Sequence, residues 1–181
     1  HAFDALQDGF ELRLDACHPL FGHARGAFTG AVERKLGRLE MAGTGTIVLD
    51  EVAALSPATQ SKLLRVLEER QFERLGSTET IVIEARLVAL TNSDLARLIA
   101  EGQFREDLFF RLSVLTIPVP ALRERPADIL PLADALLERA ARIHGRAGIT
   151  LSEPARRMLA AYGWPGNIRE LKNALERALV F

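Results

Sequence analysis

The chain has 181 residues, of which 48% are hydrophobic and 26% are charged, with 23 basic against 24 acidic side chains. A chain of this length and hydrophobicity can bury a substantial core, which excludes a disordered polypeptide. The near-neutral charge argues against a dedicated binder of the nucleic-acid backbone, because such a domain carries a basic excess or stripe.

The content of metal-binding and apolar residues excludes further classes. One cysteine and four scattered histidines argue against a disulfide framework and against a structural zinc site. No apolar run approaches the ~18 residues of a membrane-spanning helix, and the N-terminal residues lack the pattern of a secretory signal. We therefore expect a cytoplasmic protein without a membrane segment.

In chain order, the first predicted elements are a strand and a helix. Residues 46–49, Thr-Ile-Val-Leu, form a β-branched run typical of a strand that is buried on both faces of a parallel sheet. Ser56 and Pro57 then favour a helix start, with Ser56 as the cap and Pro57 in the first helical position. The predicted apolar face of this helix consists of Leu63, Leu64 and Leu67.

The next segments continue the alternation of strands and helices. Residues 72–84 predict a hairpin that turns at Gly76-Ser77, and residues 86–90 predict a second buried strand. Short helices are expected at 94–100 and 104–112. Such an alternation of buried strands with helices indicates an α/β fold with a parallel sheet.

A proline-containing segment, residues 117–126, predicts an extended connector to a different kind of domain. We place the boundary after Pro120, which gives an α/β core over residues 1–120 and a small all-helical domain over residues 121–181. Three helices are expected there. The first spans 128–144, with Asp128 as the cap and Gly145 after its end, and the second spans 152–162, with Ser152 as the cap. The last helix begins at Asn167, and Glu170 completes a capping box. Its inward-facing residues are Leu171, Leu175 and Leu179.

Acidic and amide side chains follow both predicted strands. Asp50 and Glu51 come directly after the first strand, and Asn92 follows the second. Open α/β sheets bind ligands at this edge. An acid there can hold Mg²⁺ and a second acid can orient a water, while an amide can contact a phosphate. The alternative is that the acids begin a polar loop and that Asn92 forms a turn.

Three further features have two interpretations each. Residues 26–31 have glycines around Phe28, which favours a mobile loop that presents an aromatic ring to a partner, or a turn whose ring packs into the core. Arg105 and Arg111, about 240° apart around a helix, either have separate roles or are solvated charges. Arg169 opposes the dipole at the start of the last helix, which favours an anion partner or an ion pair with a nearby acid.

Together and in this order, these segments resemble the AAA+ ATPase domain of bacterial sigma-54-dependent transcription activators. The resemblance rests on LFGHARGAFTGA at 20–31, GTGTIVLDEV at 43–52, ALTNSDL at 89–95, the segment from Phe104 to Ile129 and GWPGNIRELKNALERA at 163–178. It implies an AAA+ parallel-sheet core followed by a helical lid. It also implies ATP and Mg²⁺ as cofactors, and a hexameric or heptameric ring that remodels sigma-54 RNA polymerase.

The resemblance assigns roles to individual residues. Asp50 would hold Mg²⁺ through water, and Glu51 would activate the attacking water. Asn92 would sense the nucleotide, Arg105 and Arg111 would reach the nucleotide of the neighbouring subunit, and Arg169 would bind nucleotide from the lid. The residues that the resemblance implies for sigma-54 contact are Gly26, Ala27, Phe28, Thr29, Gly30 and Ala31.

The sequence also departs from the family pattern. None of the three lysines, Lys35, Lys62 and Lys172, follows a glycine, so the phosphate-binding G-x-x-x-x-G-K-[ST] loop is missing and the core is expected to be N-terminally incomplete. Gln7 stands where the family commonly has an asparagine that couples to the water-activating glutamate. No helix-turn-helix is present, so we expect no direct DNA binding by this chain.

Two functions remain open at this point. The chain is either part of a ring ATPase that acts on sigma-54 polymerase, or a non-catalytic fragment or remnant that binds sigma-54 or sibling subunits without turnover. Retention of Asp50, Glu51 and both arginines favours the first. The missing lysine favours the second for the chain as written, and we expect negligible ATP turnover from these 181 residues alone.

Overall fold

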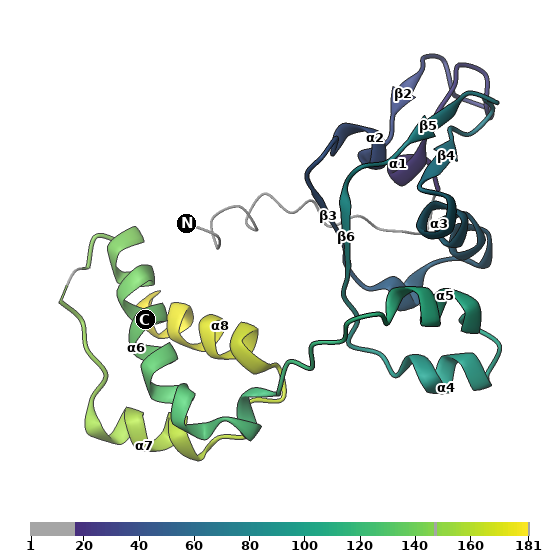
Figure 1. The fold of residues 1–181 in the computed structure, drawn as a ribbon. Helices are drawn as coiled ribbons and strands as arrows, with labels where there is room; N and C mark the ends of the chain where they lie inside the picture. The colour runs from purple at the N-terminus through teal and green to yellow at the C-terminus, as the bar shows by residue number, and fades with distance from the viewer. Residues whose placement is uncertain (1–16, 147, 181) are drawn as a thin grey trace. The chain divides into compact units, whose positions relative to one another are not determined.

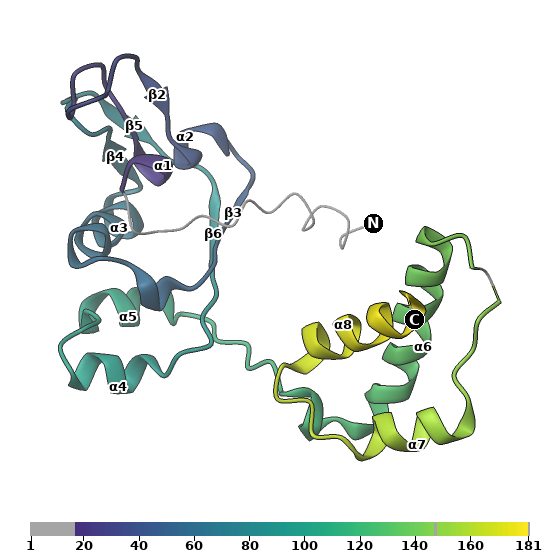
Figure 2. The ribbon, with the colours of Figure 1, turned by 180° about the vertical axis from the view of Figure 1, so that it is seen from behind.

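The computed structural model describes residues 17–146 and 148–180, so Gln7 lies outside the described residues. The chain divides into two compact units, one ending at Thr116 and the other beginning at Ile117. The sequence placed this boundary after Pro120, so the extended connector groups with the second unit. Figures 1 and 2 show the two units from opposite sides.

A parallel pair of strands runs through the first unit. Strand β3 (Thr46–Leu49) pairs in register with β6 (Arg86–Ala89), so that Leu49 lies beside Ala89. Ile47 and Leu49 are buried in the core, whereas Val48 and Val88 on the other face are 36% and 43% exposed. The prediction that both faces are buried is therefore wrong, because no element of the described ranges covers the second face.

The N-terminal part of this unit consists of short elements. They are α1 (Cys17–Phe21), β1 (Gly22–His23), β2 (Lys35–Leu36) and α2 (Arg38–Met41). Strands β1 and β2 pair antiparallel and thereby close the ends of the long connection that contains residues 26–31. Leu20, Phe21 and Leu39 anchor this part in the core.

Helix α3 (Pro57–Glu69) follows a 3₁₀ turn at Val52–Ala54. The predicted cap is confirmed, because the Ser56 hydroxyl accepts a hydrogen bond from Thr59 N at 3.3 Å. The buried face differs from the prediction. Leu63 is buried, but Leu64 and Leu67 are only partly covered, and the rest of the buried face consists of Thr59, Gln60 and Val66.

The predicted hairpin is confirmed as β4 (Gln71–Glu73) paired antiparallel with β5 (Thr80–Val82), with the Gly76-Ser77 turn between them. Helix α4 (Leu95–Ala100) is capped by Asp94.

Helix α5 (Glu106–Leu112) begins later than predicted, with Arg105 as its N-cap residue. Because Arg105 lies outside the helix, the angle predicted between it and Arg111 does not apply. Buried Phe104 and Leu108 attach this segment to the core.

The second unit is helical, as expected. Two 3₁₀ turns, Leu122–Glu124 and Pro126–Asp128, precede α6 (Ile129–Ile143), α7 (Glu153–Ala161) and α8 (Asn167–Val180). The predicted inner residues of α8 are all buried, and they pack on α6 and Trp164. In the part of the chain that the structure describes, no helix is long and apolar enough to cross a bilayer.

The helix ends of this unit confirm some predicted caps and correct others. The Ser152 hydroxyl caps α7, and Gly145 follows α6 with φ +67°. Asp128 makes no side-chain cap bond, because the 3₁₀ turn already leads into α6. The capping box of Asn167 and Glu170 is also wrong. Asn167 Oδ1 accepts from Leu122 N at 2.8 Å, while Glu170 Oε2 accepts from Gly166 N at 2.9 Å.

Candidate functional site

The two carboxylates after β3 differ in their surroundings. Asp50 is exposed, and its side chain makes no hydrogen bond with a described residue. Glu51 is half-buried and has a left-handed backbone, φ 53° and ψ 57°. Such a backbone costs a non-glycine residue on the order of 1 kcal/mol, and strained residues of this kind cluster at functional sites. It turns the chain sharply away from β3, and Val52 N closes the turn on Leu90 O at 3.0 Å.

Hydroxyl groups at the end of β6 hold the Glu51 carboxylate. Thr91 Oγ1 donates to Glu51 Oε1 at 3.0 Å. The Ser93 hydroxyl lies 3.3 Å from the same oxygen and 3.4 Å from Asn92 Oδ1. The structure thus brings Glu51 and Asn92 together around Ser93. The sequence analysis missed Thr91 and Ser93, although two hydroxyl residues flanking Asn92 at a sheet edge were an available signal.

This edge of the sheet offers two carboxylates with different chemistry. Glu51 is oriented by hydroxyl donors, which suits a group that must accept a proton from one direction. Asp50 remains open to a cation. Mg²⁺ usually binds one or two carboxylates and otherwise water or phosphate oxygens, so the acid pair fits it. No cluster of three or more acidic, histidine or cysteine ligands occurs among residues 17–146 and 148–180.

The two arginines of the α5 segment are held differently. The Arg105 guanidinium forms a two-point ion pair with Asp107, at 2.9 and 2.6 Å, and its Nη1 donates to Ser61 Oγ at 3.2 Å. This pair raises the pKa of Arg105 and lowers the pKa of Asp107. Arg111 is exposed and donates weakly to Leu67 O at 3.4 Å. Neither arginine is hydrogen-bonded to Asp50, Glu51 or Asn92 in the described chain.

Arg169 lies in the second unit, in the first turn of α8, where it is exposed. It lines a broad hollow of about 870 Å³ together with His144, Asn173 and Arg177. The ion pair that was one interpretation of Arg169 is not formed with any residue that the structure describes.

Residues 26–31 form a tight loop that is exposed from Phe28 to Gly30 and ends at buried Ala31. Gly26 N donates to Ala31 O at 2.8 Å, and Ala31 N donates to Phe28 O at 3.0 Å. Gly26 and Gly30 have φ of +78° and +100°, a conformation that side chains with a Cβ rarely adopt. Phe28 is 40% exposed and packs its ring edge-on against His23, with the centroids 5.0 Å apart. Phe28 therefore does not enter the core.

The turn between β4 and β5 supports the base of this loop, a contact that the sequence analysis missed. Ala24 N donates to Leu75 O at 2.9 Å, and Leu75 N donates to Gly22 O at 3.2 Å. A Cβ atom on Gly76 would lie 2.7 Å from the Cβ of Ala27, so only glycine allows this approach. Two segments far apart in the sequence therefore form one structural element.

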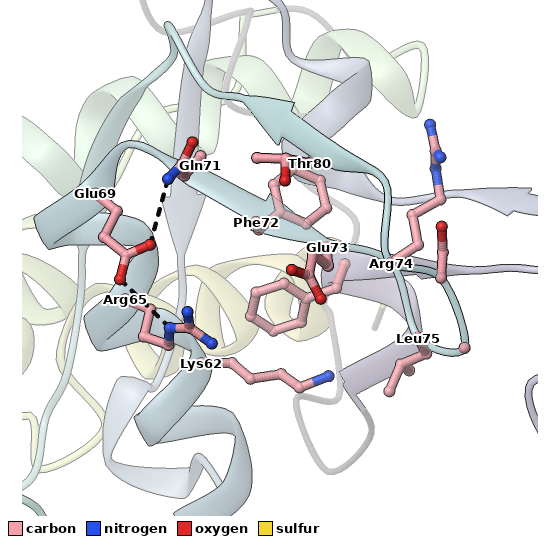
Figure 3. A pocket seen from close by; sticks show the side chains of 12 residues that line it. Lys62, Arg65, Glu69, Gln71, Phe72, Glu73, Arg74, Leu75 and Thr80 are labelled. Atoms are coloured by element: carbon pink, nitrogen blue, oxygen red, sulfur yellow. Dashed lines mark hydrogen bonds and ion pairs between the residues drawn. The ribbon is translucent and has the colours of Figure 1, made fainter.

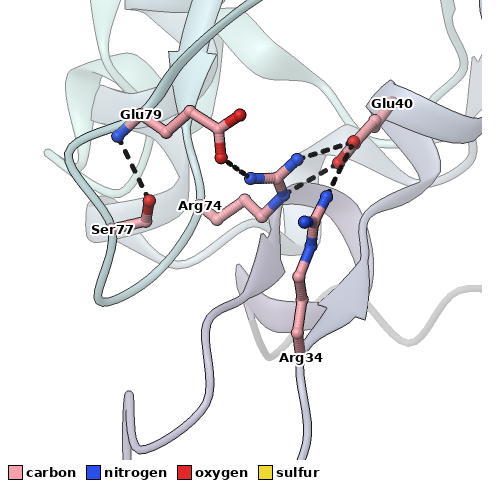
Figure 4. Close-up of polar contacts among 5 residues, drawn as sticks. All are labelled: Arg34, Glu40, Arg74, Ser77 and Glu79. Carbon is pink, nitrogen blue, oxygen red and sulfur yellow. Dashed lines mark hydrogen bonds and ion pairs between the residues drawn. The ribbon is translucent and has the colours of Figure 1, made fainter.

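A buried arginine connects the β4–β5 turn with α2, which follows the loop (Figure 4). The Arg74 side chain is only 4% exposed and donates to both carboxylate oxygens of Glu40 at 2.9 and 2.6 Å, and to Glu79 at 2.5 Å. Arg34, which follows the loop, lies 3.6 Å from Glu40. The hydrogen bonds from Arg74 lower the pKa of Glu40, against the opposing effect of burial, and those carboxylates raise the pKa of Arg74.

Substitution of Arg74 by alanine is expected to lower the free energy of unfolding by about 3 kcal/mol, because it leaves the partly buried Glu40 without its main partner. Glu79 is 64% exposed, so Glu79→Ala is the control and should cost at most about 1 kcal/mol. Urea denaturation of each variant measures both values. Equal unfolding free energies for Arg74→Ala and the wild type would contradict the expectation.

The same ion pair predicts a pH dependence. Because the folded state lowers the pKa of Glu40, this pair stabilises the fold fully above the ordinary value of 4.5. The stabilisation is lost as the pH falls through the lower folded-state pKa. Between pH 5 and the pH at which acid unfolds the protein, the unfolding free energy of the wild type should therefore fall by more than that of Arg74→Ala.

A separate hollow of about 310 Å³ lies between α3 and the β4–β5 hairpin (Figure 3). Its apolar wall includes Phe21 and Phe72, whose ring centroids are 5.9 Å apart, and Lys62 Nζ lies 5.5 Å from the Phe21 centroid. None of the candidate site residues lines this hollow. The carboxylate chemistry therefore belongs to the exposed sheet edge and not to this hollow.

Comparison with protein families gives two matches. The model of the sigma-54 interaction domain matches residues 16–118, and the model of the AAA+ ATPase lid domain matches residues 123–181. The two matches fall on either side of the connector, close to the division between the two compact units.

Individual relatives agree with the family matches. The chain is 51% identical over 161 residues to a Nif-specific regulatory protein of Azotobacter vinelandii, which covers 89% of the chain and 31% of the relative. It is 49% identical over 161 residues to the response regulator protein FleR of Pseudomonas aeruginosa, which covers 89% of the chain and 34% of FleR. The chain thus spans about a third of the length of these relatives.

Solved structures of NtrX from Brucella abortus share the fold. One superposes with a TM-score of 0.83 at 42% identity, over 90% of this chain and 36% of NtrX. The structure of NtrX in complex with ATP gives a TM-score of 0.81 at 41% identity, over 90% of this chain and 35% of NtrX.

Proposed function

The chain belongs to the family of sigma-54 interaction domains with an AAA+ ATPase lid, and from this we propose that it works within a longer transcriptional activator in the cytoplasm, called here the full-length activator. There it couples ATP hydrolysis in a ring of subunits to the remodelling of sigma-54 RNA polymerase. The observation that carries the proposal is the Glu51 turn, in which a half-buried carboxylate is aimed by Thr91 and Ser93 beside Asn92.

Phosphoryl transfer suits this arrangement, because catalysis depends mainly on positioning and on charge stabilisation. Glu51 orients the attacking water and accepts its proton, while Asn92 contacts the terminal phosphate. Asp50 holds Mg²⁺, which neutralises phosphate charge when bound. The phosphate-binding glycine-lysine loop is proposed to come from the full-length activator, since no lysine of these 181 residues follows a glycine.

The arginines complete the proposed site across a subunit interface. Arg105 is exposed and is fixed in direction by Asp107, and among the described residues it makes no hydrogen bond to Asp50 or Glu51. A guanidinium that is fixed in direction and is not bonded to the carboxylates of its own site is suited to the nucleotide of a neighbouring subunit in a hexameric or heptameric ring. Arg111 and, from the lid, Arg169 add positive charge toward nucleotide in this proposal.

The loop of residues 26–31 is the proposed contact with sigma-54. Phe28 presents an exposed aromatic ring, and aromatic side chains often dominate binding energy at interfaces. The glycines at both ends of the loop allow it to change conformation, and the β4–β5 turn braces its base. Helix α3, which follows the Glu51 turn, packs on β4, so movement of the sheet edge on hydrolysis would reach the loop through α3 and the hairpin.

The test of this proposal is Phe28→Ala in the full-length activator. We expect loss of sigma-54 binding in the nucleotide transition-state complex, because truncating a central aromatic contact typically costs at least about 2 kcal/mol, roughly 30-fold in affinity. ATP binding should be unchanged. Native gel shift with labelled sigma-54 measures the first property and nucleotide titration the second.

Val32→Ala is the matched control, since Val32 is 73% exposed just outside the loop. It should retain sigma-54 binding. Unchanged binding by Phe28→Ala would overturn the assignment of the loop.

A further inference from the structure

Gln60 is a completely buried polar residue that none of the roles above uses. It lies in the first turns of α3, and its side chain is 1% exposed. The amide nitrogen donates to Leu55 O at 2.9 Å and to Gln103 O at 3.0 Å. The amide oxygen accepts from Arg105 N at 2.9 Å. Three backbone groups from two distant segments therefore depend on one side chain, because buried polar groups need partners.

These hydrogen bonds fix the backbone at the point where the Arg105 side chain leaves it. Arg105 precedes α5 and its amide is not part of a helical hydrogen bond, so Gln60 supplies the acceptor that this amide requires. The next residue of α3, Ser61, contacts the guanidinium at 3.2 Å. Adjacent residues of α3 thus hold the main chain and the side chain of Arg105. Figure 1 shows α3 and α5 packed in the same unit.

The third bond connects the same side chain with the carboxylate turn. Leu55 follows the 3₁₀ turn that begins after Glu51, and that turn is closed by Ala54 N donating to Glu51 O at 2.9 Å. The Gln60 amide therefore joins the segment after Glu51 to the segment that carries Arg105. A hydrocarbon side chain of the same size would fill the space but would satisfy none of the three groups.

We propose that Gln60 is a positioning residue that sets where Arg105 projects toward the neighbouring subunit. The inference rests on the proposed function, in which Arg105 acts across the subunit interface. The polar contacts of Gln60 in the described chain are all with backbone groups. Its effect on hydrolysis passes through Arg105, so a correctly placed Arg105 from another subunit compensates for its loss.

The test uses Gln60→Met in the full-length activator, with folding checked by thermal melting. Turnover is expected to fall by about 10- to 100-fold, since small misplacements of a catalytic group have effects of this size, while ATP affinity stays the same. Gln71→Met is the matched control. Among the residues that the structure describes, the Gln71 amide bonds only to Glu69, at 3.4 Å, so turnover should be unchanged.

Mixing of variants then distinguishes positioning from a structural role. Glu51→Gln subunits lack the proton acceptor but keep a well-placed Arg105. Mixed rings of Gln60→Met and Glu51→Gln subunits are expected to regain turnover. In such a ring the Glu51→Gln subunit supplies a well-placed Arg105 to the intact carboxylates of a Gln60→Met subunit. Should Gln60→Met not fold, Gln60→Asn, which keeps an amide but draws it back from Arg105 N by one methylene group, takes its place in the same mixture.

The outcomes separate this inference from the function on which it rests. Arg105→Ala mixed with Glu51→Gln is the reference pair. If the reference pair regains turnover and the Gln60 pair does not, the positioning role is overturned. If neither pair regains turnover, the action of Arg105 across the interface fails, and both proposals fail with it. Full turnover by the Gln60 variant alone also overturns the inference.

Discussion

Replacement of Glu51 by glutamine in the full-length activator is expected to lower ATP hydrolysis by about 10²- to 10⁴-fold, the range typical for loss of a general base. The substitution is conservative in shape. An amide oxygen still accepts the hydrogen bonds from Thr91 and Ser93 that position the wild-type carboxylate at 3.0 and 3.3 Å. The geometry therefore persists, and the loss of turnover reports the missing proton acceptor.

Phosphate release in the presence of magnesium measures the rate, and nucleotide titration should show unchanged affinity. Glu84→Gln is the control, because Glu84 is an exposed acid between β5 and β6 with no role in the proposed site. Retention of wild-type hydrolysis by Glu51→Gln would contradict the assigned chemistry. A wild-type activator that binds sigma-54 without any turnover would instead favour the non-catalytic alternative.

The second large effect is expected for Arg105→Ala, which should lower hydrolysis by about 10³-fold, at the lower end of the effects of a trans-acting arginine. ATP affinity should change little, because the arginine acts on the nucleotide of another subunit. Arg105→Lys should not restore the rate. An ammonium group cannot reproduce the planar two-point pair with Asp107 that fixes the guanidinium direction.

Steady-state hydrolysis at saturating ATP measures this effect, with ring assembly checked by gel filtration. Arg97→Ala is the matched control, since Arg97 is an exposed arginine of α4 paired with Glu101 at 3.7 Å. Hydrolysis by Arg105→Ala at the wild-type rate would remove the arginine from the mechanism. A loss of ring assembly in this variant alone would reassign Arg105 to the interface.

Local patterns were sufficient for most elements of the fold. The β-branched run at 46–49 predicted β3, and the Ser56-Pro57 pair predicted the start of α3, because capping and strand propensity depend on neighbouring residues. The acids after β3 and Asn92 after β6 were identified for the same reason. Parallel strands bring their carboxyl ends to one edge, so this part of the site followed from the order of elements.

Capping of the last helix shows where local patterns fail. Asn167 followed by Glu170 predicted a capping box, but Asn167 instead accepts a hydrogen bond from Leu122, 45 positions away. The prediction for the two faces of the strands failed for a similar reason. Continuous apolar sequence cannot tell how many elements cover a strand, and Val48 and Val88 are exposed in the described structure.

The amino-acid sequence thus specifies the composition, the order of the elements and the residue types at the edge of the sheet that forms the site. Each of these follows from residues close together along the chain. The contacts that tune the site follow from tertiary packing. Thr91 reaches Glu51 across 40 positions, Arg74 reaches Glu40 across 34, and Gln60 reaches Arg105 across 45. Such pairs carry no periodic signal. They form only when the fold brings the partners together, and at buried Arg74 and Gln60 the polar groups need such partners because water is excluded.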